Sequence, residues 1–261
     1  MRVSKTNIGF LGFFEKIIRS HPLIYFICRS LIRFTNIFER DFDGLKKINF
    51  KKKINIIDIG ASDGIAVKFF KKNLNVNKII CFEPYKRYLK ILKKYENLII
   101  YPYAIGDKNI SKKIYFPSYN IFGKSIDLIT YAHYDYNLLK HFMKDFGYKN
   151  NLSIESSILK VKKIGSLKYK IDLIKIDTNG YEFNIILGLL KLIKKDKPLL
   201  IIEINKDEKK ISNILSKYDY DALYFSVKKN CFTKKKEKNS TNKYFIQKKM
   251  KIKKTFISPN H

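Results

Sequence analysis

The sequence predicts an α/β fold in which helices cover both faces of a doubly wound, mostly parallel sheet. Apolar runs of strand length alternate with helical patterns through the middle of the chain, as such a fold requires. The first run leads directly into a glycine-containing turn and then a helix, which is typical of a strand that binds a nucleotide-like ligand. The expected strands are residues 53–59, 78–82, 98–101, 171–176, 199–204 and 222–227, and the expected helices are residues 85–95, 181–193 and 206–217.

The turn after the first strand indicates the kind of ligand. Gly60 and Gly64 allow the backbone to turn sharply and approach a ligand, and the following helix points free N–H groups at it. Asp58 lies at the end of the strand, where a carboxylate would repel a pyrophosphate but suits a ligand with an ammonium and a sulfonium group. The residues therefore favour S-adenosylmethionine and disfavour a NAD-dependent dehydrogenase. In the alternative interpretation the turn only starts a helix, with Ser62 or Asp63 as its cap.

A second acid supports the ligand-binding interpretation. Glu83 follows the strand at residues 78–82, where its carboxylate can accept hydrogen bonds from both hydroxyl groups of a ribose. This role is common to both classes of cofactor. Glu83 therefore indicates a ribose, and Asp58 indicates adenosylmethionine rather than NAD.

Five motifs in chain order resemble those of the FkbM-type methyltransferases, over about residues 41–246. The fourth motif, with the pattern Lys-x-Asp-x-x-Gly-x-Glu, is the most specific. The chain departs from the usual family pattern in the first motif, where Ser62 follows Ala61 in place of Asn, and it has Asn179 before the glycine of the fourth. The motifs are Asp58-Ile-Gly-Ala-Ser-Asp-Gly64, Phe82-Glu83-Pro84, Ala104-Ile-Gly-Asp107, Ile174-Lys-Ile-Asp177-Thr-Asn-Gly180-Tyr-Glu182 and Ile201-Ile-Glu203-Ile.

The resemblance implies a Rossmann-like sheet of seven strands whose last strand, at residues 244–246, is antiparallel. It also implies S-adenosylmethionine as the cofactor and O-methylation of sugars or polyketides, often in pathways that make surface polysaccharides. The residues that it assigns to the cofactor are Asp58, Gly60, Ser62, Gly64, Glu83, Pro84, Ala104, Asp107 and Asp177.

The candidate catalytic residues are Asp177, Glu203 and His141. Asp177 follows the fourth strand, so we expect it to orient the acceptor hydroxyl or to take its proton; the alternative is that it caps the helix beginning near Gly180. Glu203 is the second candidate base, and His141 is a third, inside an amphipathic helical pattern. Asp177 and Asn179 alone are weak evidence for magnesium, and no metal is predicted.

Glu182 follows two residues after Gly180, within the helix expected there. We expect it to serve the structure, paired with Lys175.

The domain organisation is predicted from changes in composition. Residues 1–45 form a basic amphipathic helical extension, residues 46–247 the methyltransferase domain and residues 248–261 a basic tail. An insertion at residues 115–151, dense in Tyr and Phe, is the expected lid over the acceptor; the alternative is that its aromatic residues pack a helix at 134–146 onto the sheet. The extension is predicted to lie on an anionic membrane surface, or alternatively to cover the domain or a second copy in an oligomer.

The net charge of +31 does not by itself indicate a nucleic-acid reader. Of 54 basic residues 48 are Lys, a bias that an AT-rich genome would produce, whereas specific readers favour clustered Arg. The three cysteines are far apart in sequence and predict neither a disulfide nor a zinc site. The chain is therefore predicted to be cytoplasmic, with a peripheral position at the inner membrane face as a further option.

Two classes of function remain open at this point. The first is an S-adenosylmethionine-dependent O-methyltransferase for a hydroxyl of a carbohydrate or lipid-linked glycan. The second is a nucleic-acid-associated protein, either an RNA methyltransferase or a non-catalytic basic RNA-binding module. No Asn-Pro-Pro-Tyr base pocket follows the fourth strand, which disfavours the RNA enzyme.

Overall fold

The computed structural model describes residues 40–121, 123–145, 151–165, 167–237 and 240–250. The chain divides into two compact units: Phe38–Ile110 with Lys160–His261 form the larger, and Ser111–Leu159 belong to the smaller. Most of the predicted N-terminal extension and residues 251–261 of the predicted tail lie outside the described residues.

The larger unit contains an eight-stranded mixed sheet with the strand order β11-β10-β12-β9-β8-β1-β2-β3. The strands from β9 to β3 are parallel, and β12 is antiparallel to both of its neighbours. The predicted Rossmann-like α/β fold and the antiparallel last strand are confirmed, whereas the count of seven strands is wrong. The bounds are β1 Ile54–Ile59, β2 Val76–Phe82, β3 Leu98–Tyr101, β8 Leu173–Ile176, β9 Leu199–Glu203, β10 Tyr220–Ser226, β11 Cys231–Thr233 and β12 Asn242–Gln247.

The additional strand, β11, pairs with β10 in a lysine-rich stretch where no strand was predicted. It is three residues long and is followed by Lys234, Lys235 and Lys236, so it presents almost no apolar periodicity. Its short length on the edge of the sheet, beside these lysines, matches how proteins blunt exposed edges.

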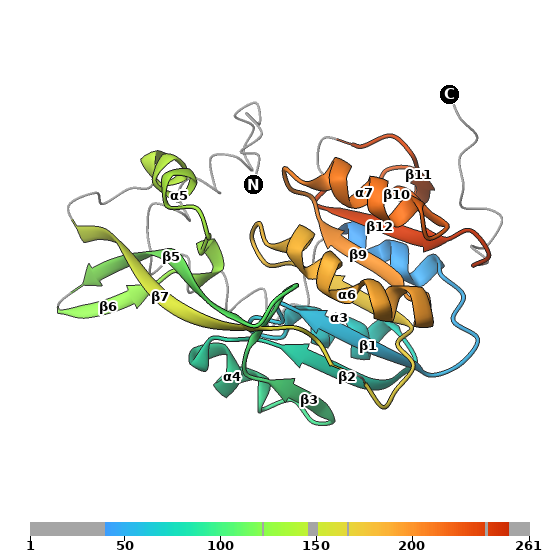
Figure 1. Cartoon of the computed structure of the whole chain (residues 1–261), viewed down its shortest axis with the longest axis horizontal. Helices are drawn as coiled ribbons and strands as arrows, with labels where there is room; N and C mark the ends of the chain where they lie inside the picture. Colours follow the sequence, from blue (N-terminus) through green and yellow to red (C-terminus); the bar gives the residue numbers. More distant parts are fainter. Residues whose placement is uncertain (1–39, 122, 146–150, 166, 238–239, 251–261) are drawn as a thin grey trace. The chain divides into compact units, whose positions relative to one another are not determined.

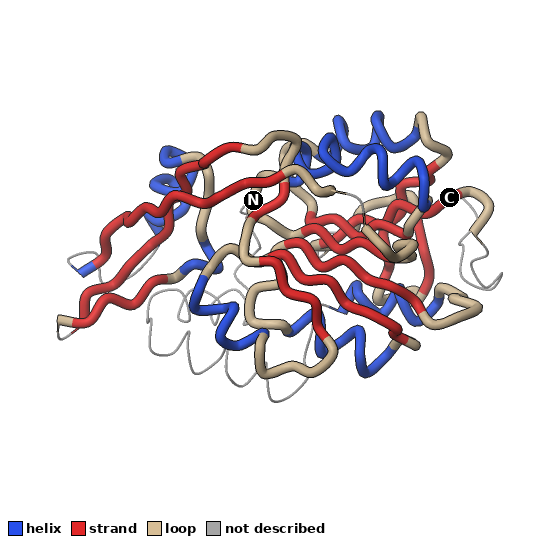
Figure 2. The backbone as a smooth tube through the Cα atoms, turned by 60° about the horizontal axis from the view of Figure 1, so that its bottom comes forward, coloured by secondary structure: helices blue, strands red, loops and turns tan. Residues whose placement is uncertain are grey.

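Helices lie on both faces of this sheet (Figure 1). One face packs against the 3-10 helix η1 (Arg40–Lys47), α3 (Ile65–Asn73) and α4 (Lys86–Leu92), and the other against α6 (Glu182–Asp196) and α7 (Glu208–Ser216). Figure 2 shows the same sheet edge-on between the two helical layers. The two layers follow from right-handed crossovers that run in opposite directions from β1 and β8.

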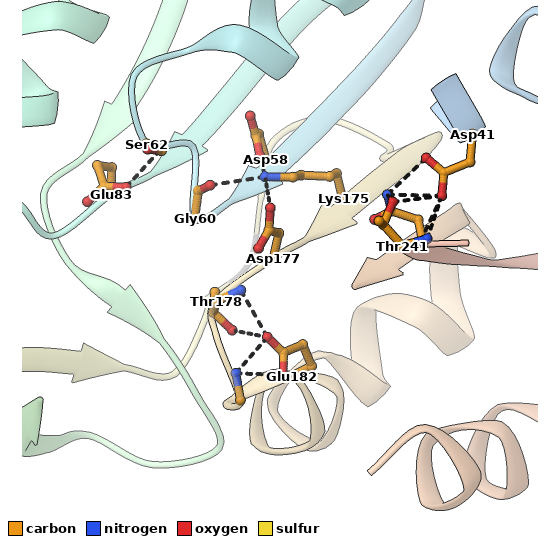
Figure 3. A network of polar contacts seen from close by, with 12 residues as sticks. Asp41, Asp58, Gly60, Ser62, Glu83, Lys175, Asp177, Thr178, Glu182 and Thr241 are labelled. Carbon is orange, nitrogen blue, oxygen red and sulfur yellow. Dashed lines mark hydrogen bonds and ion pairs between the residues drawn. The ribbon is translucent and has the colours of Figure 1, made fainter. Parts of the chain in front are cut away.

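The beginning of the described chain is fastened to β12 through a buried carboxylate (Figure 3). Asp41 accepts hydrogen bonds from the backbone N–H groups of Thr241 and Asn242 at 3.1 and 2.8 Å. The Tyr244 hydroxyl donates to the Asp41 carbonyl oxygen at 2.7 Å. Phe42 and Leu45, on the same helix, are buried in the core with Phe70 of α3. Residues 40–45, which were predicted as part of the extension, thus pack into the larger unit.

Strands that were not predicted flank the helical part of the insertion expected at residues 115–151. β5 (Ile110–Ile121) pairs with β6 (Lys124–Asp127), and both belong to a four-stranded sheet of order β4-β7-β5-β6, with β4 at Ala104–Ile105 and β7 at Leu152–Lys162. The predicted helix at 134–146 corresponds to α5 (Tyr136–Phe142) and the 3-10 turn η3 (Met143–Asp145). Asp135 caps α5 by accepting from the Leu138 N–H at 3.1 Å.

The helices of the described part of the chain include none that is long and apolar enough to cross a membrane.

Candidate active site

Four neighbouring strands of the larger unit bring polar residues to one level at their carboxyl ends. Phe82, Ile59, Ile176 and Ile202 are paired across β2, β1, β8 and β9. The residues that follow them are Glu83, Gly60, Asp177 and Glu203. Ligands of doubly wound sheets bind beyond this edge.

The turn between β1 and α3 has an unusual backbone. Gly60, Ser62 and Gly64 have positive φ angles of 77°, 49° and 79°. A Cβ atom on Gly60 would lie 1.9 Å from the carbonyl oxygen of Asp177, so only glycine lets the two strand ends approach this closely. The N-cap of α3 is Gly64, with no side-chain cap bond, so the alternative that Ser62 or Asp63 caps this helix is wrong.

A buried ion pair lies directly behind this turn. Asp58 and Lys175 are cross-strand neighbours on β1 and β8, with the Lys175 Nζ 3.1 Å from the Asp58 Oδ1. The Asp58 side chain is fully buried and that of Lys175 is 5% exposed. Burial raises the pKa of Asp58, and the ammonium of Lys175 opposes that rise.

Lys175 also contacts two groups in front of Asp58 (Figure 3). Its Nζ donates to the Gly60 carbonyl oxygen at 3.0 Å and lies 3.5 Å from the Asp177 Oδ2. These contacts of Lys175 were not predicted from the sequence. The signal was a lysine in the otherwise apolar run of β8, because a charge in a strand buried on both faces needs a partner.

Glu83 fastens the same turn to the end of β2. Its carboxylate accepts hydrogen bonds from the Ser62 N–H at 2.8 Å and the Tyr85 N–H at 2.9 Å. Burial raises the pKa of Glu83 to about 7, although both N–H groups act to lower it. Pro84, between Glu83 and Tyr85, is partly buried.

The connection from β8 to α6 is held by Glu182. This buried carboxylate accepts from the Thr178 N–H at 2.9 Å, the Thr178 hydroxyl at 3.0 Å and the Gly180 N–H at 3.1 Å, and also from the Asn205 amide. The predicted pair between Glu182 and Lys175 is wrong, because Lys175 faces the α3 side of the sheet and Glu182 begins α6 on the other side.

Asp177, just before this connection, does not cap α6. The N-cap of that helix is Tyr181, with no side-chain cap bond, so the alternative of a capping role for Asp177 is wrong. The Asp177 side chain is 38% exposed, whereas Asp58 and Glu83 are buried. Asp177 is thus the most exposed of these three carboxylates.

The other predicted residues lie at several places. The Asp107 carboxylate accepts from the Asn184 amide at 3.4 Å, at the start of α6. Ala104 lies in β4, and Glu203 is partly buried at the end of β9. His141 is exposed on α5 of the smaller unit. Within the described residues, no group of three or more His, Cys, Asp or Glu side chains could hold a metal ion.

The chemistry of these residues fits S-adenosylmethionine. Two carboxylates, Asp58 and Asp177, contact Lys175, and the charge of Lys175 also acts to lower the pKa of a third, Glu83. This group of acids favours a cationic ligand in a chain whose net charge is +31. Apart from Lys175, no described residue gives either carboxylate oxygen of Asp58 a partner. Glu83 could hold a ribose diol, and Asp58 and Asp177 suit an ammonium and a sulfonium.

Comparison with known proteins supports this fit. Residues 58–223 match the model of the methyltransferase FkbM domain, which is more than half of the chain. None of the curated proteins matches the chain.

Solved structures similar to the chain include the methyltransferase FkbM from Methylobacillus flagellatus KT, at 16% identity and a TM-score of 0.48. The match covers 76% of this chain and 44% of that one, so the chain spans less than half of that protein's length. The plantazolicin methyltransferase BpumL in complex with SAH is 11% identical with a TM-score of 0.46, and the match covers 89% and 95% of the two chains.

The matched segment begins at Asp58, includes Glu83, Asp107, Asp177 and Glu203, and ends in β10. It thus contains all four strand ends that carry the gathered acids. The chain belongs to the FkbM methyltransferase family, whose members use S-adenosylmethionine.

Proposed function

We propose that the chain transfers a methyl group to a hydroxyl of a carbohydrate or lipid-linked glycan. The observation that carries this proposal is the partial exposure of Asp177 beside the buried Asp58 and Lys175. A carboxylate in this position can orient an acceptor hydroxyl and accept its proton.

The protein's part in the reaction is to bind, orient and deprotonate. The cofactor, when bound, supplies an electrophilic methyl group on a sulfonium. Glu83 accepts hydrogen bonds from the ribose hydroxyls, and Asp58 contributes negative charge behind the turn. Asp177 holds the acceptor hydroxyl and takes its proton at a carboxylate oxygen. The turn residues Gly60, Ser62 and Gly64, together with Pro84, Ala104 and Asp107, complete the proposed cofactor-binding set.

Glu203 and His141 stay as alternative bases. Glu203 ends the strand next to that of Asp177, at the same edge of the sheet in the larger unit. His141 belongs to the smaller unit. We therefore rank Asp177 first, Glu203 second and His141 third.

Aromatic residues of the smaller unit support a sugar acceptor. Tyr115 and Tyr136 contact each other edge to face with ring centroids 5.3 Å apart, and Tyr136 is 42% exposed. Lys113 lies over the Tyr115 ring with its Nζ 5.4 Å from the centroid. Exposed tyrosine faces with polar partners are a common way to bind a sugar ring.

The test is a methyl-transfer screen with radiolabelled S-adenosylmethionine against free sugars, nucleotide sugars, lipid-linked oligosaccharides and RNA. We expect a methyl ether on a saccharide, identified by mass spectrometry, and loss of transfer but not of cofactor binding in Asp177→Ala. Labelled RNA without labelled saccharide would favour the nucleic-acid alternative instead. Full transfer by Asp177→Ala would move the role of base to Glu203 or His141.

A further inference from the structure

We propose that Lys175 is a positioning residue that holds the Asp177 carboxylate in place beside the sulfonium of the bound cofactor. This inference rests on the proposed role of Asp177, and it assigns Lys175 a part beyond balancing the charge of Asp58.

Burial makes Lys175 a fixed charge. Its side chain is 5% exposed, and its ammonium meets three oxygen atoms from three places in the chain. These are the Asp58 carboxylate at 3.1 Å, the Gly60 carbonyl at 3.0 Å and the Asp177 carboxylate at 3.5 Å. An ammonium has three donors, so this environment uses its capacity to bind oxygen and fixes its position.

The contacts of Lys175 extend from the buried interior of the sheet to the solvent-exposed carboxyl ends of the strands. Asp58 lies on β1 in the fully buried row of the sheet, Gly60 lies in the turn above it, and Asp177 follows β8 with 38% of its side chain exposed. Lys175 therefore joins the buried layer to a carboxylate that reaches solvent. An exposed carboxylate without such a contact would sample several rotamers, and the ion pair with a fixed ammonium restricts it.

The exposed charge that results is negative and directional. Lys175 compensates Asp58 from between the strands, so the free side of the Asp177 carboxylate points away from the ammonium. A sulfonium is attracted to that side, whereas the thioether of S-adenosylhomocysteine carries no charge there. The ratio of affinities for the two ligands thus reports on the negative charge beside the sulfonium, because the ribose, the ammonium and their contacts are common to both.

The experiment measures both affinities by calorimetry in four proteins. These are the wild type, Asp177→Asn, the double variant Asp58→Asn with Lys175→Met, and the triple variant that combines all three changes. The double variant removes both members of the buried pair, so no uncompensated charge is left in the core. Lys243→Met on β12, two strands from Lys175, breaks a 2.8 Å ion pair with Glu208 and is the matched control.

In Asp177→Asn we expect the preference for S-adenosylmethionine over S-adenosylhomocysteine to fall about fivefold, as expected for one partly screened charge. The double variant should lose a similar part of this preference, and the triple variant no more than either. Lys243→Met should leave the ratio unchanged.

An unchanged ratio in the double variant would overturn the proposal, because Lys175 would then serve only to balance Asp58. A rise in the ratio would also overturn it, since Lys175 would then weaken Asp177 rather than position it. An unchanged ratio in Asp177→Asn would show that Asp177 does not face the sulfonium, and would remove the basis of the inference. None of these results depends on the acceptor, so failure of the glycan screen leaves this test intact.

Discussion

Two neighbouring connections, β8 to α6 and β9 to α7, each lead into a helix that begins with a glutamate, but the two glutamates have different partners. Glu182 begins α6 and is fully buried, with the backbone N–H groups of its own connection as partners. Glu208 begins α7, its side chain is 22% exposed, and it binds Lys243 at 2.8 Å and the Tyr224 hydroxyl. The first glutamate thus shapes a loop, and the second attaches a helix to the sheet.

The difference follows from the backbone of the two connections. In the first, Asn179 and Gly180 have positive φ angles of 56° and 104°, and the Gly180 N–H turns inward, where Glu182 accepts from it. This conformation places Asp177 at the strand end, so the connection that carries the proposed catalytic acid is also the one held by a buried carboxylate. A lysine also lies near each connection. Lys175 on β8 pairs with Asp58, and Lys243 on β12 pairs with Glu208, so the two lysines provide matched variants.

The largest expected effect is the loss of stability on replacing the buried Lys175. Lys175→Met leaves the Asp58 carboxylate buried without its counter-ion, so we expect the free energy of unfolding to fall by about 3–5 kcal/mol. Lys243→Met should cost less than half of this, because its partner Glu208 keeps access to water and to Tyr224. Urea unfolding of both variants at neutral pH measures the difference.

The double variant Asp58→Asn with Lys175→Met tests the cause of this loss. Because it removes both charges, it should recover most of the stability. If Lys175→Met and Lys243→Met lost the same free energy of unfolding, the burial of the Asp58–Lys175 pair would not make its disruption more costly.

A smaller effect is expected at the two glutamates. Glu182→Gln replaces one acceptor oxygen by an amide that faces N–H donors, so it should cost about 2 kcal/mol. Hydrogen exchange should show faster exchange of the Thr178 and Gly180 amides in this variant. Glu208→Gln should destabilise the protein without changing exchange at these two amides, and a change there would contradict the separation of the two roles.

Much of the larger unit could be predicted from the sequence. Parallel strands buried on both faces give continuous apolar runs, and the expected run at residues 98–101 has the same bounds as β3. The acids that end these runs were predicted to converge because parallel strands end at one edge. Cys81, inside one of these runs, is fully buried.

The remaining features depend on contacts between distant residues. The pair of Asp58 and Lys175 depends on the register of β1 and β8, which are 117 residues apart at this row and whose alignment is set by the whole sheet. The partners of Glu182 depend on a left-handed loop that a sequence pattern does not specify. In the smaller unit, Pro117 within β5 argues against a strand by composition, so the sheet there was missed.

The smallest expected effect is on the pH dependence of stability, which should have opposite signs at Glu182 and Glu208. Burial raises the pKa of Glu182 above its ordinary value, and the hydrogen bonds from its own N–H and from those of Gly180 and Thr178 offset this only in part. At Glu208 burial also acts to raise the pKa, but the hydrogen bonds from Lys243 and Tyr224 and the charge of Lys243 outweigh it and lower the pKa. The folded state therefore favours the protonated form at the first site and the ionised form at the second.

The two sites should consequently contribute to stability in opposite directions as the pH changes. The contribution of Glu182 is largest below its ordinary pKa and declines as the pH rises through the raised value. That of Glu208 is fully present above its ordinary pKa and is lost as the pH falls through the lowered value. The measurement is urea unfolding of wild type, Glu182→Gln and Glu208→Gln from a pH below the ordinary pKa of a glutamate to neutral pH. The stability difference between wild type and variant should shrink with rising pH for Glu182→Gln and grow for Glu208→Gln. The same slope for both would mean that the two glutamates experience one environment, which the buried loop of the first and the lysine contact of the second contradict.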